Sequence, residues 1–153
     1  MELKFQRNLD FQLDAIKSTV DIFESQKFSH ESFFVIPENG VIPNVLSLTQ
    51  EQILANLNKI QKNNNIEPIK KLEGMNFSIE METGTGKTYV YLRTIFDLYK
   101  NYGLKKFIVI VPSVAIKEGV LKNLKITEKH FKEIYENTPY SYYEYDSKKI
   151  NLI

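Results

Sequence analysis

Apolar residues recur at intervals of three and four, the period of an amphipathic helix, in several stretches of this 153-residue chain. The pattern predicts helices over residues 9–27, 49–60, 87–101, 113–123 and 127–136. Thr49 and Gln52, three residues apart, have the spacing of a capping box at the start of the second helix. Gly103 follows the third helix as a C-terminal stop.

Two other stretches have the pattern of strands. Residues 77–81 alternate between apolar and polar side chains, and residues 107–111 form a continuous apolar run of the kind found in buried parallel strands. A short strand is also predicted over residues 33–36. With the helices between them, these strands predict an α/β fold, a three-layer sandwich with parallel strands. We expect a mostly helical segment over residues 1–74 and a partial α/β lobe over 75–153.

Composition limits the function classes. The chain is 42% hydrophobic, with 10 Phe and 9 Tyr, which is enough apolar material for a core. A formal net charge of +1 gives no overall attraction for nucleic acid, so any DNA contact must be local. There is no cysteine, and His30 and His130 lack partner ligands at metal spacing. No apolar run has the length of a membrane span, so we expect no membrane partner and a cytoplasmic location.

The stretch over residues 81–88, Met-Glu-Thr-Gly-Thr-Gly-Lys-Thr, joins a predicted strand to a predicted helix and has the form of a nucleotide phosphate loop. Gly84 and Gly86 permit positive φ, so that backbone N–H groups can point at phosphate oxygens. Lys87 supplies a positive charge at the helix N-terminus, and Thr88 supplies a hydroxyl for Mg²⁺. The loop predicts ATP and Mg²⁺ as cofactors, with Lys87 and Thr88 as the catalytic residues. The alternative is a Gly-rich turn before an amphipathic helix.

Three motifs together resemble the start of the Res subunit of type III restriction enzymes, which are superfamily 2 helicase-like proteins. These motifs are residues 81–91, 106–120 and 145–149. The resemblance implies a RecA-like fold, ATP-dependent translocation or switching on double-stranded DNA, and a Mod methyltransferase partner that reads the DNA sequence. It also implies a downstream nuclease, so that the parent protein would be an ATP-dependent site-specific deoxyribonuclease.

The resemblance also implies a nucleotide site. Its members are Gln12, Glu82, Thr83, Gly84, Thr85, Gly86, Lys87 and Thr88. Met81 departs from the stricter form of the loop, which begins with glycine. Gln12 resembles a glutamine whose amide reads the adenine edge as donor and acceptor, which suits the chemistry of that side chain. The alternative for Gln12 is a solvent-facing position on an amphipathic helix.

The resemblance places a DNA-backbone contact at Pro112, Ser113 and Lys117. Backbone N–H groups at a helix start, a hydroxyl and a lysine hold phosphates without reading sequence. The alternative is a plain strand-to-helix turn.

One element of a motor is missing, because no apolar strand ending in Asp-Glu follows the phosphate loop. Neither Arg7 nor Arg93 has the position of an arginine finger. We therefore expect a truncated N-terminal part of a longer protein, which binds nucleotide but is not catalytically competent alone. A small-molecule P-loop kinase is an alternative, which the scarcity of arginine disfavours. A non-catalytic nucleotide-binding module left by truncation is another.

Overall fold

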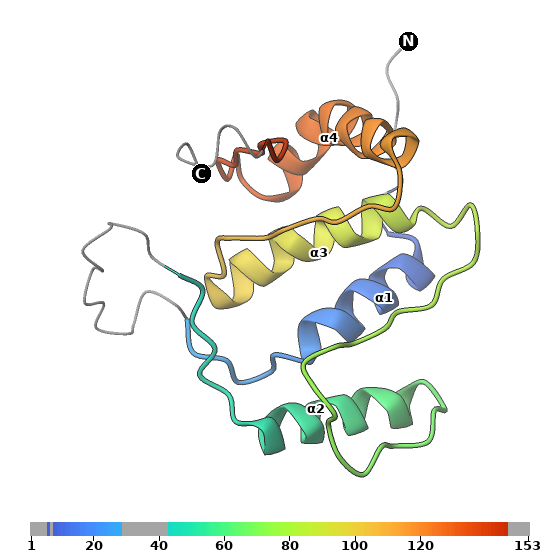
Figure 1. Ribbon diagram of the computed structural model, residues 1–153, viewed down its shortest axis with the longest axis vertical. Helices are drawn as coiled ribbons and strands as arrows, with labels where there is room; N and C mark the ends of the chain where they lie inside the picture. The colour runs from blue at the N-terminus through green and yellow to red at the C-terminus, as the bar shows by residue number, and fades with distance from the viewer. Residues whose placement is uncertain (1–5, 7, 29–42, 147–153) are drawn as a thin grey trace.

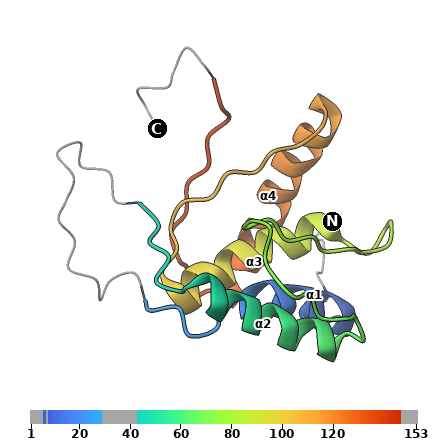
Figure 2. The same ribbon diagram turned by 60° about the horizontal axis from the view of Figure 1, so that its bottom comes forward.

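The computed structural model describes residues 6, 8–28 and 43–146, and these contain four helices. The helices are α1 (Asp10–Asp21), α2 (Gln50–Asn63), α3 (Lys87–Tyr102) and α4 (Val114–Ile134). They lie in the order α2, α1, α3, α4, and each packs against the next (Figure 1). Figure 2 shows that α4 projects away from the layer that the other three form. The predicted strand over 33–36, His30 and the end of the 145–149 motif lie outside the described residues.

The first three predicted helices are confirmed, although α1 ends at Asp21 and not at residue 27, and the end signals of the other two are confirmed as well. Thr49 and Gln52 form the predicted capping box of α2, since the Thr49 N–H donates to Gln52 Oε1 at 2.8 Å and the Gln52 N–H donates to Thr49 Oγ1 at 3.3 Å. Gly103 ends α3 in the left-handed region, with φ of 67°. Local capping chemistry therefore sets these boundaries.

The predicted division of the last helical region into two helices is wrong, because α4 runs without a break. Thr127 lies inside it, fully buried, and its hydroxyl donates to the Asn123 carbonyl one turn earlier, at 2.7 Å. A threonine whose hydroxyl bonds back in this way is accommodated within a helix.

The predicted α/β sandwich with parallel strands, and with it the RecA-like lobe, is wrong for this structure. The part of the chain that the structure describes contains helices but no strand, and both 77–81 and 107–111 are irregular. No backbone hydrogen bond joins these two described segments. An apolar alternating sequence favours a strand only where a neighbouring strand pairs with it.

In place of a sheet, α1 covers one apolar face of α3. Val90 and Leu98 are buried against Ile16 and Val20 of α1, with Leu104 completing the cluster. Periodicity identified the buried face, but it did not identify the element that covers that face.

The other face of α3 packs on α4 through aromatic rings. Phe96 stacks on Tyr135 with ring centroids 4.9 Å apart, and Phe131 is 1% exposed between the helices. The Tyr135 hydroxyl donates to the Asp97 carboxylate at 2.7 Å, and burial together with this bond raises the pKa of Tyr135. The helix α3 is therefore packed on both sides, by α1 and by α4.

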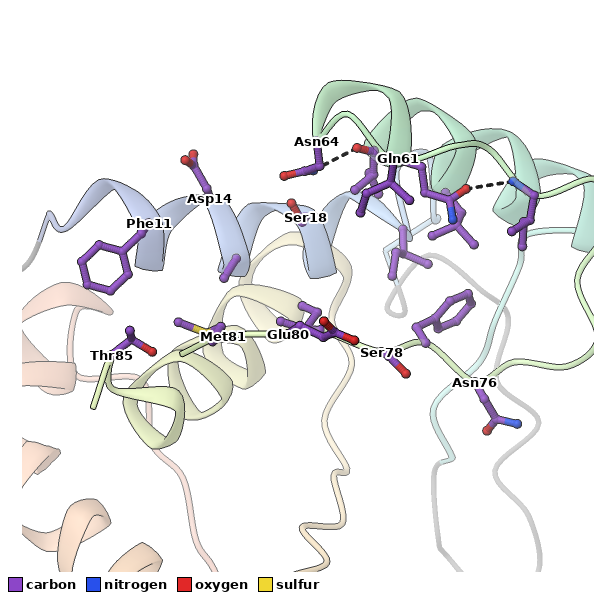
Figure 3. A pocket seen from close by; sticks show the side chains of 18 of the residues that line it. Phe11, Asp14, Ser18, Gln61, Asn64, Asn76, Ser78, Glu80, Met81 and Thr85 are labelled. Carbon is purple, nitrogen blue, oxygen red and sulfur yellow. Dashed lines mark hydrogen bonds between the residues drawn. The ribbon is translucent and has the colours of Figure 1, made fainter. Parts of the chain in front are cut away.

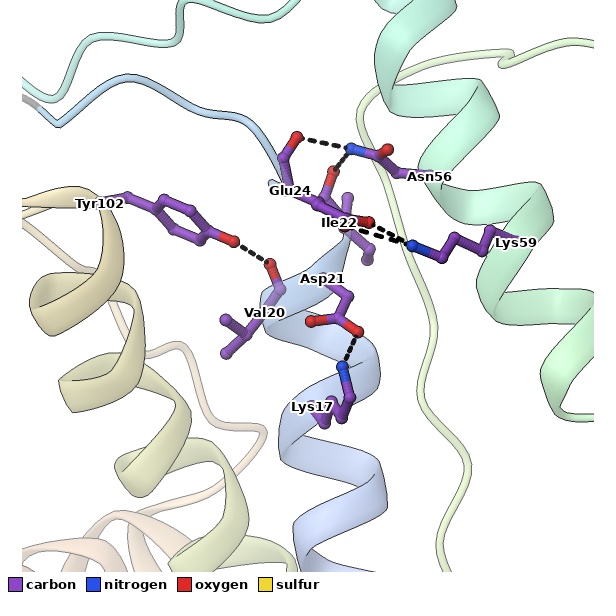
Figure 4. Close-up of polar contacts among 8 residues, drawn as sticks. All are labelled: Lys17, Val20, Asp21, Ile22, Glu24, Asn56, Lys59 and Tyr102. Atoms are coloured by element: carbon purple, nitrogen blue, oxygen red, sulfur yellow. Dashed lines mark hydrogen bonds and ion pairs between the residues drawn. The ribbon is translucent and has the colours of Figure 1, made fainter.

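Polar contacts join α1 to α2 and α3 beyond the apolar cores (Figure 4). The Asn56 amide donates to the carbonyls of Ile22 and Glu24 at 3.0 Å, and Lys59 pairs with Glu24 at 2.8 Å. The Tyr102 hydroxyl donates to the Val20 carbonyl at 3.2 Å. The Tyr102 and Asn56 bonds thus provide partners for carbonyls at and just after the end of α1.

The segment over 107–111 leaves apolar side chains in water. Phe107 packs on the α1–α3 core, but Ile108 and Ile110 are 90% and 89% exposed. An apolar extended-type segment with no paired neighbour is a site for association with another chain.

We predict that the isolated chain associates as its concentration rises, and that the double substitution Ile108→Lys and Ile110→Lys suppresses this by adding two charges to the exposed segment. Sedimentation velocity over a concentration series measures it. Val114→Lys, which is 70% exposed in the wild type but lies in a helix, is the matched control and should change association little. A wild-type chain that stays monomeric throughout would contradict the prediction.

Candidate functional site

The phosphate-loop motif forms a tight turn that leads directly into α3. Gly84 and Gly86 have φ of 84° and 86°, as the motif predicted, and Gly86 is the N-cap of the helix. This left-handed conformation is strained for any residue with a Cβ, so both positions require glycine. The two glycines together turn the chain from the irregular segment into the helix axis.

Lys87 is the first residue of α3, and its side chain folds back over the loop. Its ammonium donates to the carbonyls of Met81 and Glu82 at 2.9 and 2.8 Å, and the side chain remains exposed. The Thr85 hydroxyl donates to the Glu82 carbonyl at 2.7 Å and closes the turn from the other side. The Lys87 ammonium charge therefore lies over the loop, and it is hydrogen-bonded to neutral carbonyls that a ligand could replace.

The N-terminus of α3 has the electrostatics of an anion site. Its N-cap residue, Gly86, has no side chain that could cap it, and its first turn contains no acidic residue. The N–H groups of a first helical turn have no intrahelical partner and carry the positive end of the helix dipole. Thr88 is half-buried in this turn, beside Tyr91. Burial raises the pKa of Tyr91, and the interaction with the Thr88 hydroxyl lowers it by a smaller amount.

Gln12 of α1 lies against this loop, although it is 73 residues away in sequence. Its side chain is 8% exposed, and its Nε2 donates to the Thr85 carbonyl at 2.8 Å. A Cβ added to Gly86 would stand 2.6 Å from the same Nε2. The structure thus brings Gln12 and the loop together, and a buried position replaces the solvent-facing alternative. The adenine contact stays a prediction.

A cavity that the sequence did not predict opens beside the loop (Figure 3). Its volume is about 1010 Å³, and it lies between α1, α2 and the segment over 76–82. Apolar side chains such as Ile22, Leu57, Ile60 and Phe77 line one part, and Asp14, Glu82 and Thr85 line the end at the loop. The apolar residues at positions 77, 79 and 81 form part of this wall, but their alternation with polar residues was interpreted as a strand.

The predicted DNA-contact residues lie together at the start of α4. Pro112 and Ser113 are exposed, and Ser113 is the N-cap, its Oγ accepting from the Ile116 N–H at 3.3 Å. The Lys117 ammonium pairs with Glu144 and, at 3.7 Å, with Glu118, and the bond to Glu144 raises the pKa of Lys117. No sequence pattern indicated the Glu144 contact.

Within the described ranges, no group of three or more His, Cys, Asp or Glu side chains has the arrangement of a metal site. The role of Thr88 toward Mg²⁺ stays a prediction. None of the described helices is long and apolar enough to cross a membrane.

Comparison with known proteins places the chain among restriction enzymes. It is 39% identical over 137 residues to the EcoPI Res subunit of Escherichia phage P1, an alignment that covers 86% of this chain and 14% of that protein. It is 42% identical over 96 residues to the EcoP15I Res subunit of Escherichia coli, covering 60% and 10%. It is 49% identical over 65 residues to the StyLTI Res subunit of Salmonella typhimurium, covering 41% and 7%.

The chain thus spans only a small fraction of the length of these relatives. All three are type III restriction-modification enzyme subunits by name, which agrees with the resemblance seen in the motifs. The family model described as "Type III restriction enzyme, res subunit" matches residues 44–153, well over half of the sequence. This chain belongs to the type III restriction enzyme Res subunit family.

Proposed function

We propose that this chain binds ATP and Mg²⁺ through residues 82–88, as the nucleotide-binding part of a type III restriction enzyme. The observation that supports it most is the geometry of Gly84 and Gly86, which turn the chain in the left-handed region straight into the uncapped N-terminus of α3. Oriented N–H groups at such a terminus hold phosphate oxygens.

The charges at the loop suit a triphosphate. The Lys87 ammonium already lies over the turn, and its bonds to the Met81 and Glu82 carbonyls can exchange for charge-assisted bonds to phosphate. The Thr88 hydroxyl, one residue further, is the ligand that the chain offers to Mg²⁺, which when bound neutralises phosphate charge. The cavity between α1 and α2 begins at Thr85, so it offers room for the rest of a nucleotide.

In the whole protein, we propose that ATP use drives action on double-stranded DNA together with a Mod methyltransferase subunit. The named relatives are subunits of restriction-modification enzymes, and the family match over residues 44–153 of this chain includes the loop. Alone, the chain should have negligible ATP turnover, because no apolar segment ending in Asp-Glu follows the loop in this sequence to position the attacking water.

We predict that Lys87→Ala weakens ATP binding by about 1.5–3 kcal/mol, the range for hydrogen bonds to a charged group. Titration calorimetry with MgATP measures the difference. Lys100→Ala is the matched control, since Lys100 is an exposed lysine in the last turn of the same helix and should leave affinity unchanged. Equal ATP affinity in wild type and Lys87→Ala would remove the support for this nucleotide site.

We also propose that the start of α4 contacts the DNA backbone through Pro112, Ser113 and Lys117. Ser113 is the N-cap of α4, and Lys117 lies one turn further along the helix. The Lys117 side chain is half-buried, and its charge is paired with Glu144. A DNA phosphate must therefore compete with a carboxylate for this lysine.

For DNA, we predict opposite effects of the two partners in this ion pair. Lys117→Ala should weaken binding to a DNA duplex and reduce the slope of log K against log salt by about 0.9, because one phosphate contact is lost. Glu144→Gln should strengthen binding, since it removes the closer of the two carboxylates that pair with the lysine. Lys132→Ala, which removes a lysine paired with Glu128 near the other end of α4, is the control. Fluorescence anisotropy at several salt concentrations provides the measurement, and an unchanged slope for Lys117→Ala would exclude the contact.

A further inference from the structure

We infer that Tyr91 is a positioning residue for the Thr88 hydroxyl, and that its phenolic oxygen accepts the Thr88 hydrogen when the Thr88 oxygen binds Mg²⁺. The inference rests on the proposed function, because it takes Thr88 as the hydroxyl that this chain offers to the cation. It assigns a role to a tyrosine of α3 that lies outside the phosphate-loop motif.

The first support is that the Tyr91 hydroxyl differs from other tyrosine hydroxyls on α3. The Tyr89 hydroxyl is hydrogen-bonded to His130 Nε2 at 2.9 Å. The Tyr102 hydroxyl donates to the Val20 carbonyl at 3.2 Å. The Tyr91 hydroxyl oxygen is shielded from solvent, yet it has no hydrogen bond of ordinary geometry within the described part of the chain. A buried polar group in that condition destabilises a fold, so its presence calls for an explanation.

The second support is the direction of the Tyr91 side chain. Side chains of an α-helix lean toward its N-terminus and lie over the residues three and four positions earlier. For Tyr91 these are Thr88 and Lys87, the first two residues of α3. The Tyr91 ring is half-buried and packs against the cluster between α3 and α4 that contains Phe96 and Phe131, which restricts its movement. The ring therefore carries its hydroxyl toward the turn that holds the candidate cation ligand.

The third support is the sign of the interaction between the two hydroxyls. The Thr88 hydroxyl lowers the pKa of Tyr91, although burial raises this pKa by more. A neighbour that lowers a tyrosine pKa stabilises negative charge on the phenolic oxygen, as a hydrogen-bond donor to that oxygen does. Threonine has two χ1 rotamers available in a helix, so a rotation of the Thr88 side chain can complete the bond.

The chemistry of a hydroxyl ligand requires such an acceptor. A hydroxyl that binds a cation uses a lone pair of its oxygen, and its hydrogen must point away from the positive charge. Groups that accept a hydrogen bond from a metal ligand orient that ligand and strengthen metal binding. The first turn of α3 contains no acidic residue that could take this role. The Tyr91 oxygen is thus the acceptor that α3 itself offers to Thr88.

The experiment uses the full 153-residue chain and measures thermal unfolding together with ATP affinity, with MgCl₂ and with EDTA. Tyr91→Phe keeps the ring and its packing but removes the buried hydroxyl. We expect it to raise the thermal midpoint of the chain without nucleotide by about 2–4 °C, because a buried group that lacks a partner is lost. The same change should weaken MgATP binding about three- to tenfold, as the loss of one hydrogen bond implies, and leave ATP affinity in EDTA unchanged.

Two further variants give the controls. Tyr102→Phe removes a tyrosine hydroxyl from the last turn of the same helix. It should lower the thermal midpoint, because the Val20 carbonyl loses its partner, and leave both ATP affinities unchanged. Thr88→Val, which keeps the side-chain shape without the hydroxyl, should weaken MgATP binding. Adding Tyr91→Phe to Thr88→Val should then have no further effect on MgATP affinity, because the two hydroxyls act as one unit.

The outcomes separate this inference from the proposed function. Equal MgATP affinity in wild type and Tyr91→Phe would overturn the role of Tyr91 and leave the nucleotide site in place, and so would additive losses in the double variant. A lower thermal midpoint for Tyr91→Phe would show that its hydroxyl serves the fold, which contradicts the inference. If the wild-type chain binds ATP equally with and without Mg²⁺, the cation role of Thr88 fails and the role of Tyr91 with it. If it binds no ATP at all, the nucleotide site itself fails.

Discussion

The packing of α1 on α3 is the contact on which the rest of this structure depends. Ile16 and Val20 on one helix bury Val90 and Leu98 on the other, and a buried apolar side chain of this size contributes about 1.5–3 kcal/mol. The same contact fixes α2, which packs on α1, and α4, which packs on the other side of α3. It also brings Gln12 to the phosphate loop, so the fold and the candidate site have a common cause.

The sequence predicted the helices well because their signals are local. The Thr49 capping box, the Gly103 stop and the spacing of apolar residues each act within one or two turns. The prediction of a sheet was wrong because a strand depends on a pairing partner, which the local sequence pattern does not reveal. Residues 107–111 have the composition of a buried strand, yet Ile110 is 89% exposed and no described segment pairs with it. The predicted helix boundary before residue 127 was wrong for a related reason. A buried threonine whose hydroxyl bonds to the Asn123 carbonyl fits inside a helix as well as at a boundary.

At the site, the motif predicted the backbone conformation of the loop but not the side-chain contacts around it. Positive φ at Gly84 and Gly86 follows from residue type and spacing, and the structure has it. The return of Lys87 to the Met81 and Glu82 carbonyls depends on how the loop closes, which spacing alone does not determine. The Gln12 contact spans 73 residues, and only the helix packing decides that its amide meets Thr85. The pairing of Lys117 with Glu144 is likewise a product of the tertiary fold.

The two helix N-termini that were expected to bind anions differ in physical character. At α4, the Ser113 hydroxyl already satisfies the Ile116 N–H, and the Lys117 charge is paired with a carboxylate. At α3 the N-cap is a glycine, the first turn has no acid, and the Lys87 ammonium donates to two neutral carbonyls. An anion at α4 must displace existing partners, whereas one at α3 meets N–H groups without an intrahelical partner and a lysine that forms no ion pair with a described residue. We therefore expect the α3 terminus to be the stronger anion site of the two, and binding of a small polyanion there to require less rearrangement than binding of DNA at α4.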